Sequence, residues 1–215
     1  MTALPPTGTV PKPPTTFPIH VTDLPVGAML WRIHAEQFAG DTFNPGFGQS
    51  RFAPIGPIHN RVPTAYAADG FEAAIYETIF HDLDPVEPFK TYALGKLANV
   101  RCSVLRVESA LGLRSFMTPD LMKLGVARTR LIDTPAREFP DTRRWSAALH
   151  HRDNATHGMI WESRAYPSSM AMMLFGDRVP SNALSVVSTL RIDADPGLAM
   201  RFKALADRSG VTLVV

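Results

Sequence analysis

TAYAADGFEAAIYE, residues 64–77, joins a short strand candidate to the start of a helix. Ala65–Ala67 form the strand candidate, and Asp69 and Glu72 have the spacing of a capping box, which predicts a helix from there to about Phe80. The apolar face of that helix carries Phe71, Ala74, Ile75, Thr78 and Ile79. Glu77 lies well off this face, so its carboxylate is predicted to point away from the helix's buried side.

A second strand candidate precedes this unit and contains an arginine. Met29, Trp31 and Ile33 alternate with Leu30, Arg32 and His34, so the two sets point to opposite faces of a strand. Residues 38–64 follow, with glycines at 40, 46, 48 and 56 and four prolines, and they predict a long loop. Loops of this length usually act as lids or binding surfaces.

The remaining pattern predicts an α+β protein. Helices are expected at 118–125, 143–151 and 196–208, and strands at 92–94, 103–107, 159–162, 170–174, 185–192 and 211–215. The helices are interspersed irregularly among short strands, without the regular alternation of a doubly wound sheet. Antiparallel or mixed sheets with flanking helices therefore fit best.

Composition excludes several classes of protein. The 215 residues are 45% hydrophobic and 20% charged, as expected of one globular domain rather than a disordered chain. The formal net charge is +2, without runs of Lys and Arg, so nucleic acid is not expected as a direct partner. The single cysteine, Cys102, forbids an internal disulfide and is expected to be a small buried apolar residue. No metal site is predicted, because the seven histidines lack helical ligand spacing.

The N-terminus is rich in proline, and seven of the 19 prolines fall in residues 1–25. Proline disfavours helix and inner strand, so this segment is expected to be either a disordered tail or an extended arm anchored by Phe17 and Ile19, followed by one catalytic domain over 26–215. The sequence start lacks a secretory signal, and the longest apolar run, Met170–Phe175, is too short to span a bilayer. A cytoplasmic protein without membrane contact is expected.

Four polar residues stand in apolar surroundings, and each has an ordinary structural interpretation. Arg32 suits a phosphate or carboxylate ligand, or an internal salt bridge to Glu36 or Asp41. Glu77 fits a solvated helix position, Tyr66 a core position and Ser163 the end of a strand. Taken one at a time, these residues do not decide a function.

In order along the chain, however, the motifs resemble those of the RES-domain family, named for an arginine, a glutamate and a serine. They are Trp31-Arg32, Ser50-Arg51-Phe52, Pro63 to Ala68, Ala73 to Glu77, and Gly158 to Arg164. The resemblance extends over roughly residues 28–190, and the strand and helix of residues 64–77 are its most specific part. Ser50 departs from the pattern, because many members have glycine before the second arginine.

This resemblance implies an ADP-ribosyltransferase-like fold, similar to diphtheria toxin, with sheets around an NAD cleft. It implies the toxin of a bacterial toxin–antitoxin pair that splits the nicotinamide–ribose bond of NAD+, which is consumed as a substrate. ADP-ribose would pass to an acceptor, with a cellular protein favoured over phosphate or water. The implied partner is a small antitoxin with a helix-turn-helix part, which covers the toxin's cleft. A catalytically silent nucleotide-binding or partner-binding domain is the alternative of a different class.

The resemblance also implies roles for five residues. Glu77 would bind the ribose 2′-hydroxyl and stabilise the cation that develops on the sugar. Arg32 would clamp phosphate or the nicotinamide ribose, and Arg51 would contact the pyrophosphate. Tyr66 would present its ring to nicotinamide. Ser163 would either hydrogen-bond the nicotinamide side or hold Glu77 in place.

Overall fold

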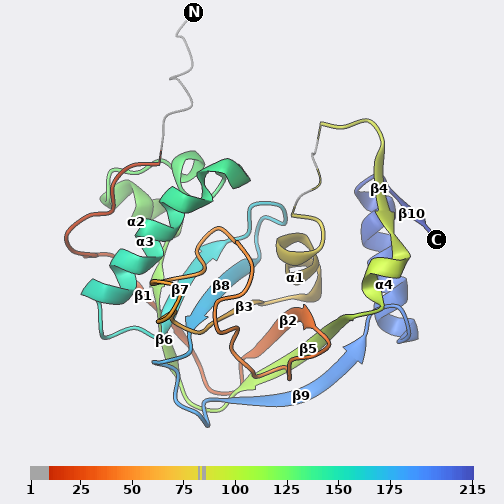
Figure 1. Cartoon of the computed structure of the whole chain (residues 1–215), viewed down its shortest axis with the longest axis horizontal. Coiled ribbons are helices and arrows are strands. Elements are labelled where there is room, and N and C mark those ends of the chain that lie inside the picture. The colour runs from red at the N-terminus through yellow and green to blue at the C-terminus, as the bar shows by residue number, and fades with distance from the viewer. Residues whose placement is uncertain (1–9, 82, 84–85) are drawn as a thin grey trace, which may run out of the picture.

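The computed structural model describes residues 10–81, 83 and 86–215, and Figure 1 shows a curled sheet with helices around it. The strands are β1 (Val21–Leu24), β2 (Met29–Ala35), β3 (Thr64–Ala68), β4 (Lys90–Ala93), β5 (Val100–Val107), β6 (Leu111–Ser115), β7 (Gly158–Glu162), β8 (Met170–Phe175), β9 (Leu184–Arg191) and β10 (Val211–Val214). The α-helices are α1 (Phe71–Thr78), α2 (Thr118–Lys123), α3 (Phe139–Arg152) and α4 (Pro196–Arg208). Short 3₁₀ turns are η1 (Leu94–Leu97), η2 (Arg128–Arg130) and η3 (Ala136–Glu138).

The large sheet has eight strands in the order β1-β6-β7-β8-β3-β2-β5-β9. Its β6–β7 pair is parallel and its other neighbouring pairs are antiparallel, while β4 and β10 form a separate parallel pair. This confirms the mixed α+β class. The predicted elements all have counterparts, although α3 begins at Phe139 instead of residue 143.

Strand β8 explains how the sheet carries a core on each face. Successive side chains of a strand point to opposite faces, and here both faces are covered: Met173 and Phe175 pack with α2 and α3, and Met172 and Leu174 pack into a second cluster against Leu30 of β2. The sequence of a central strand that is buried on both faces is typically a continuous apolar run. Residues 170–175, the longest apolar run of the sequence, are such a strand.

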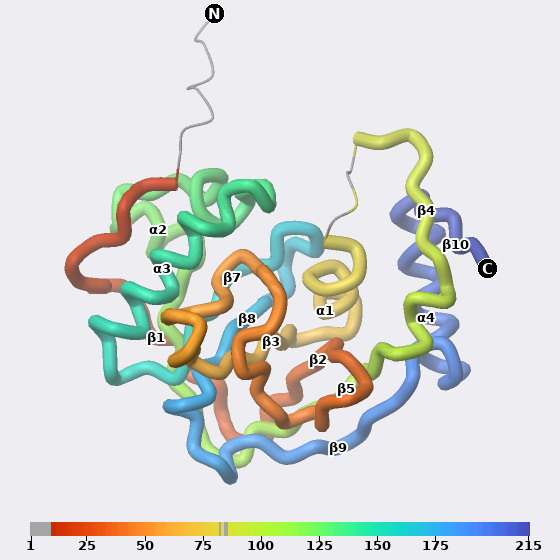
Figure 2. Tube along the Cα trace, in the orientation of Figure 1, coloured from red at the N-terminus to blue at the C-terminus, as the bar shows by residue number. Residues whose placement is uncertain are grey.

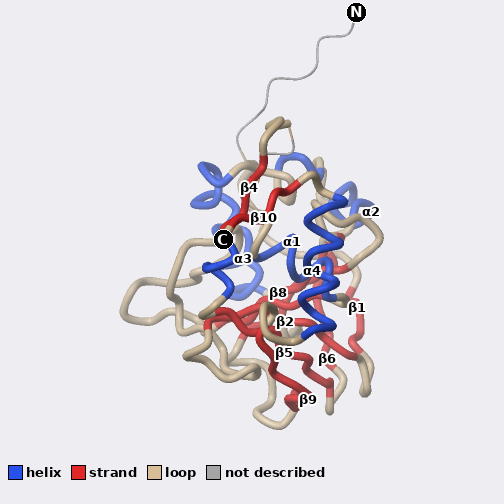
Figure 3. The backbone as a smooth tube through the Cα atoms, turned by 90° about the vertical axis from the view of Figure 1, so that its right-hand side faces the viewer, coloured by secondary structure: helices blue, strands red, loops and turns tan. Residues whose placement is uncertain are grey.

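The helices lie on one face of the sheet, in two groups. Helices α2 and α3 cover a cluster that includes Phe52, Trp145 and Trp161, and α1 and α4 cover a cluster around Phe71 and Phe202. Figure 3, turned by a quarter, shows the strands of the large sheet in the lower half of the molecule and the β4–β10 pair near its top. The opposite face carries the cluster of Leu30.

The proline-rich segment packs on the domain from residue 10 onward. Phe17 is 7% and Ile19 5% exposed, and the Trp145 indole N–H donates to the Pro11 carbonyl oxygen at 2.7 Å. Figure 2 shows this stretch running beside α2 and α3 before it enters β1. Residues 10–20 thus pack on the domain as an extended arm, residues 21–24 form β1 of the large sheet, and residues 1–9 lie outside the described residues.

Three local predictions need correction. Strands β1 and β6 were not expected, because β1 follows the prolines and β6 contains Gly112 within a run of five residues. The capping box does not form: Gly70 is the residue that caps α1, without a side-chain hydrogen bond. Glu72 is held by Arg201 of α4 instead, and its carboxylate accepts from the Arg201 guanidinium at 2.8–3.0 Å.

Candidate active site

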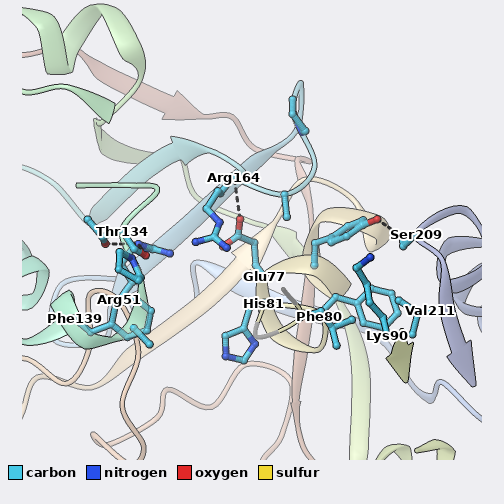
Figure 4. A pocket seen from close by; sticks show the side chains of 16 residues that line it. Arg51, Glu77, Phe80, His81, Lys90, Thr134, Phe139, Arg164, Ser209 and Val211 are labelled. Atoms are coloured by element: carbon cyan, nitrogen blue, oxygen red, sulfur yellow. Dashed lines mark hydrogen bonds between the residues drawn. The ribbon is translucent and has the colours of Figure 1, made fainter. Parts of the chain in front are cut away.

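A cavity of about 730 Å³ lies between α1, the Arg51 loop and the separate β4–β10 pair. Arg51, Thr134 and Phe139 line one end, Glu77 and Arg164 the middle, and Lys90, Ser209 and Val211 the other end, as Figure 4 shows. The volume falls within the roughly 300–1,000 Å³ range of small-molecule sites. Segments far apart in the sequence thus meet around one glutamate.

Glu77 is held through one of its two carboxylate oxygens. Its Oε1 accepts from Ser163 Oγ at 2.7 Å and from the Arg164 backbone N–H at 3.2 Å. The Tyr166 backbone N–H donates to Ser163 Oγ at 3.3 Å, so the hydroxyl proton of Ser163 is directed to Glu77. Of the two roles expected of Ser163, the geometry favours holding Glu77. Within the described chain, no hydrogen bond reaches the second oxygen, Oε2.

Arg51 lies half-buried at one end of the cavity. Its Nη1 donates to Thr134 Oγ1 at 2.6 Å and to the Thr134 carbonyl oxygen at 2.8 Å, and its guanidinium stacks over the Phe139 ring at 4.9 Å. Burial lowers the pKa of Arg51 to about 10, and the Glu77 carboxylate opposes this shift. The side chain is still cationic at neutral pH, so this end of the cavity is positive.

Tyr66 does not line the cavity; it contacts the loop that carries Arg51. Its hydroxyl oxygen accepts from Ser50 Oγ at 3.0 Å and from the Phe52 backbone N–H at 3.1 Å, and its ring meets the edge of Trp161. Burial raises the pKa of Tyr66 to about 12, so the phenol stays protonated. The Ala53 carbonyl oxygen lies 3.1 Å from Ser50 Oγ and shares the one proton of that hydroxyl with Tyr66, so Ser50, the residue that departs from the family pattern, contacts both groups.

Arg32 is not brought to this cavity. Trp31 contacts Phe71 of α1, so the next residue of β2 points to the opposite face of the sheet. There Arg32 is 5% exposed, and its Nη1 donates to the Gly40 carbonyl oxygen at 2.7 Å. Burial lowers the pKa of Arg32 to about 10, while Asp41 opposes the shift. Among the described residues Arg32 forms neither of the two expected salt bridges: Asp41 acts on it only at longer range, and Glu36 pairs with Arg101.

The family can now be assigned. The profile of the RES domain matches residues 29–196, more than three quarters of the chain. The chain belongs to the RES-domain family. The match contains Arg51, Glu77, Thr134, Phe139 and Arg164 of the cavity. It also contains Ser163, which holds Glu77.

A solved structure shares the fold at low sequence identity. A chain in the crystal structure of the M. tuberculosis MbcT–MbcA toxin–antitoxin complex superposes with a TM-score of 0.59 and 14% identity, covering 83% of this chain and 90% of that chain. At this identity the similarity concerns the fold alone. No functionally curated protein matches the chain.

Several residues of this RES-domain cavity were not predicted from the sequence. Arg164 directly follows Ser163 in the last motif, and that position was a usable signal. Thr134 and Phe139 lie in a segment without any motif, and only the fold brings them to Arg51. Tyr76, next to Glu77, lines the cavity, and its hydroxyl bonds Ser209.

The described residues contain no group of three His, Cys, Asp or Glu side chains arranged to hold a metal ion. No helix among them is both long and apolar enough to cross a membrane.

Proposed function

We propose that this RES-domain protein is the toxin of a bacterial toxin–antitoxin pair and that it cleaves the nicotinamide–ribose bond of NAD+, with transfer of ADP-ribose to an acceptor. Family membership over residues 29–196 supports the proposal, as does a shared fold with a chain of the MbcT–MbcA toxin–antitoxin complex. The observation that carries it is Glu77, whose Oε1 is fixed by two donors while Oε2 stays available in the cavity.

The reaction needs a carboxylate beside the ribose. As the C1′–N bond breaks, its electron pair goes to the nicotinamide nitrogen, which leaves neutral, and positive charge moves onto the ribose ring. The acceptor then forms a bond to C1′ and gives up its proton. A carboxylate that is already oriented stabilises this developing charge without reorganising. Glu77 fills this role through Oε2, and Ser163 and the Arg164 backbone hold it in place.

The other roles follow the geometry. Arg51 and Arg164 line the cavity on the side of Glu77 where the pyrophosphate would lie, and forked guanidinium donors suit its oxygens. Tyr66 acts by holding residues 50–52 in position. The proposal assigns Arg32 no substrate contact, because its side chain lies on the opposite face of the sheet.

Glu77→Gln is the direct test, because it keeps the hydrogen-bond acceptor for Ser163 and removes the charge. We expect a loss of about 10² to 10³ in the rate of nicotinamide release, or roughly 3–4 kcal/mol, the scale of one electrostatic stabiliser. Glu36→Gln removes an exposed glutamate that pairs with Arg101 and serves as the control with unchanged rate. A loss below about tenfold in a folded Glu77→Gln protein contradicts the assignment.

The acceptor is tested separately. We favour a cellular protein, because the long loop of residues 36–63 borders the site and offers a docking surface. Incubation with NAD+ labelled in its ADP-ribose part, alone, with phosphate, and with cell lysate distinguishes water, phosphate and protein as acceptors by the product that carries the label. Release of nicotinamide without labelled protein would mean that the protein hydrolyses or phosphorolyses NAD+ instead of modifying a cellular protein.

The toxin assignment has its own test. Expression of the wild-type chain alone should arrest bacterial growth, and the Glu77→Gln form should be tolerated. Co-expression of a cognate antitoxin that covers the cavity should restore growth. Normal growth with soluble wild-type protein present would contradict the assignment.

A further inference from the structure

The Arg51 guanidinium has one fixed edge and one open edge. Nη1 makes both hydrogen bonds to Thr134, at 2.6 Å to Oγ1 and 2.8 Å to the carbonyl oxygen. Nε and Nη2 make no hydrogen bond to any other described part of the chain, although the side chain lines the cavity. The open edge therefore presents two parallel donors, the geometry that binds two oxygens of one anion.

Thr134 is itself rigidly placed. It is 1% exposed, and its hydroxyl donates to the Leu131 carbonyl oxygen at 3.4 Å, which leaves an oxygen lone pair for Arg51. Leu131 and Ile132, just before it, are fully buried in the cluster under α2 and α3. Thr134, which accepts the hydrogen bonds of the Arg51 guanidinium, is thus fixed against the core.

Two further contacts restrict Arg51. The Arg51 guanidinium carbon lies over the Phe139 ring, 4.9 Å from its centroid, a cation–π contact that favours this position of the guanidinium. The Thr142 hydroxyl of α3 donates to the Arg51 backbone carbonyl oxygen. The loop residue is therefore held at both its backbone and its side chain by one segment about 90 residues later, as Figure 4 shows for Thr134 and Phe139.

The charge of Arg51 is met by carboxylates only at longer range, because Glu77 and Asp133 favour its charged form without forming an ion pair with it. No carboxylate of the described residues lies within ion-pair distance of Arg51, and Asp133, the adjacent acid, pairs with Arg128 at 3.2 Å. A half-buried guanidinium without an ion pair gains most from an anionic ligand that enters the cavity. A phosphate oxygen pair matches both its charge and its fork.

We propose that Thr134 is a positioning residue that, together with Phe139, presets the open edge of Arg51 to grip a phosphate of a nucleoside diphosphate. This inference rests on the proposed function and specifies which part of the substrate this end of the cavity recognises. It predicts that Thr134 governs affinity for the diphosphate and leaves the chemical step at Glu77 unchanged.

Thr134→Val tests the inference, because valine keeps the buried shape and removes the hydroxyl. Loss of one charge-assisted hydrogen bond should weaken ADP-ribose binding about tenfold, measured by calorimetry on the otherwise wild-type chain. KM for NAD+ should rise by a similar factor with kcat nearly unchanged. Thr134→Ser restores the hydroxyl and should bind ADP-ribose as the wild type does.

Nicotinamide riboside, which lacks phosphate, provides the matched ligand. On a Glu77→Gln background, Thr134→Val should leave its binding unchanged. Three results would each overturn the inference: Thr134→Val weakens the binding of ADP-ribose and of nicotinamide riboside equally, Thr134→Ser weakens ADP-ribose binding as much as Thr134→Val does, or Thr134→Val leaves ADP-ribose binding unchanged. In each case, cleavage of NAD+ by the wild-type protein would still support the proposed function. Tight ADP-ribose binding without NAD+ cleavage would instead overturn the proposed reaction and leave the inference standing.

Discussion

Buried polar residues follow the concave face of β2 and β5. His34 is 8% exposed, its Nδ1 pairs with the Ala35 carbonyl oxygen at 3.0 Å, and its Nε2 pairs with Ser103 Oγ at 2.7 Å. Because a carbonyl oxygen only accepts, Nδ1 carries the proton and Ser103 donates to Nε2. Ser103 Oγ also forms a hydrogen bond with Thr189 Oγ1 at 2.7 Å, so the neutral His34 ring, Ser103 and Thr189 are joined by consecutive hydrogen bonds.

The His34 ring predicts a pH dependence of stability. Burial, with a smaller effect of Arg32 and Arg101, lowers its pKa below the ordinary value of 6.5. As the pH falls through 6.5, the unfolded chain takes up the proton first and the folded chain does not, so the free energy of unfolding decreases. Above that pH both states are neutral at this residue and its contribution is constant.

The measurement is denaturant unfolding from about pH 7.5 to about pH 5.5. We expect the wild type to lose more stability over this interval than His34→Gln, and His59→Gln, which removes an exposed histidine, to follow the wild type. An identical pH slope for wild type and His34→Gln would refute the prediction.

At the scale of elements, tertiary contacts override local sequence signals. Asp69 and Glu72 have capping-box spacing, yet Glu72 pairs with Arg201, whose guanidinium also covers the rings of Phe71 and Trp31 at 4.6 and 5.1 Å. A two-donor ion pair with two aromatic contacts outweighs one capping hydrogen bond of about 1 kcal/mol. Helix ends and side-chain partners therefore depended on packing.

Arg178 stabilises the end of α3 from outside the helix. Its guanidinium donates to the carbonyl oxygens of His150, Asp153 and Thr156, and burial lowers its pKa. The last carbonyl groups of a helix lack partners within the helix. Arg178→Ala should therefore cost about 1–3 kcal/mol in the free energy of unfolding.

The control for this prediction lies on the same helix. Arg144 is exposed, and its one ion pair among the described residues is with Asp141, one turn earlier, at 2.9 Å. Arg144→Ala should therefore change stability by less than about 0.5 kcal/mol. Urea unfolding of both variants compares the two arginines directly. Equal effects would show that Arg178 does not cap α3.

On the scale of the whole molecule, the arm of residues 10–20 closes one side of the core. Phe17 contacts the rings of Phe116 and Trp145, each with centroids 6.2 Å away. Arg114 of β6 donates to the Ile19 carbonyl oxygen at 2.5 Å. The arm and the sheet therefore share one hydrophobic cluster with α2 and α3.

Phe17→Ala should destabilise the fold by about 3–5 kcal/mol, as expected for a large side chain removed from a core. Phe47→Ala, at a loop position that is 66% exposed, is the matched control, with a change within about 0.5 kcal/mol. Thermal and urea unfolding measure both. If Phe17→Ala is as mild as the control, the arm is a peripheral segment rather than part of the core.

The sequence by itself determined the family and most of the elements, β1 and β6 excepted, because strand and helix periodicity are local and the RES motifs are short strings such as residues 64–77. It also determined that Glu77 projects away from the buried side of its helix. Only the tertiary structure decided which side chains meet there. The pleat of β2 turns Arg32 to the far face of the sheet, and the packing of residues 131–142 brings Thr134 and Phe139 to Arg51, 83 or more positions away. Such meetings depend on how distant segments bury their apolar faces together, and no local pattern encodes them.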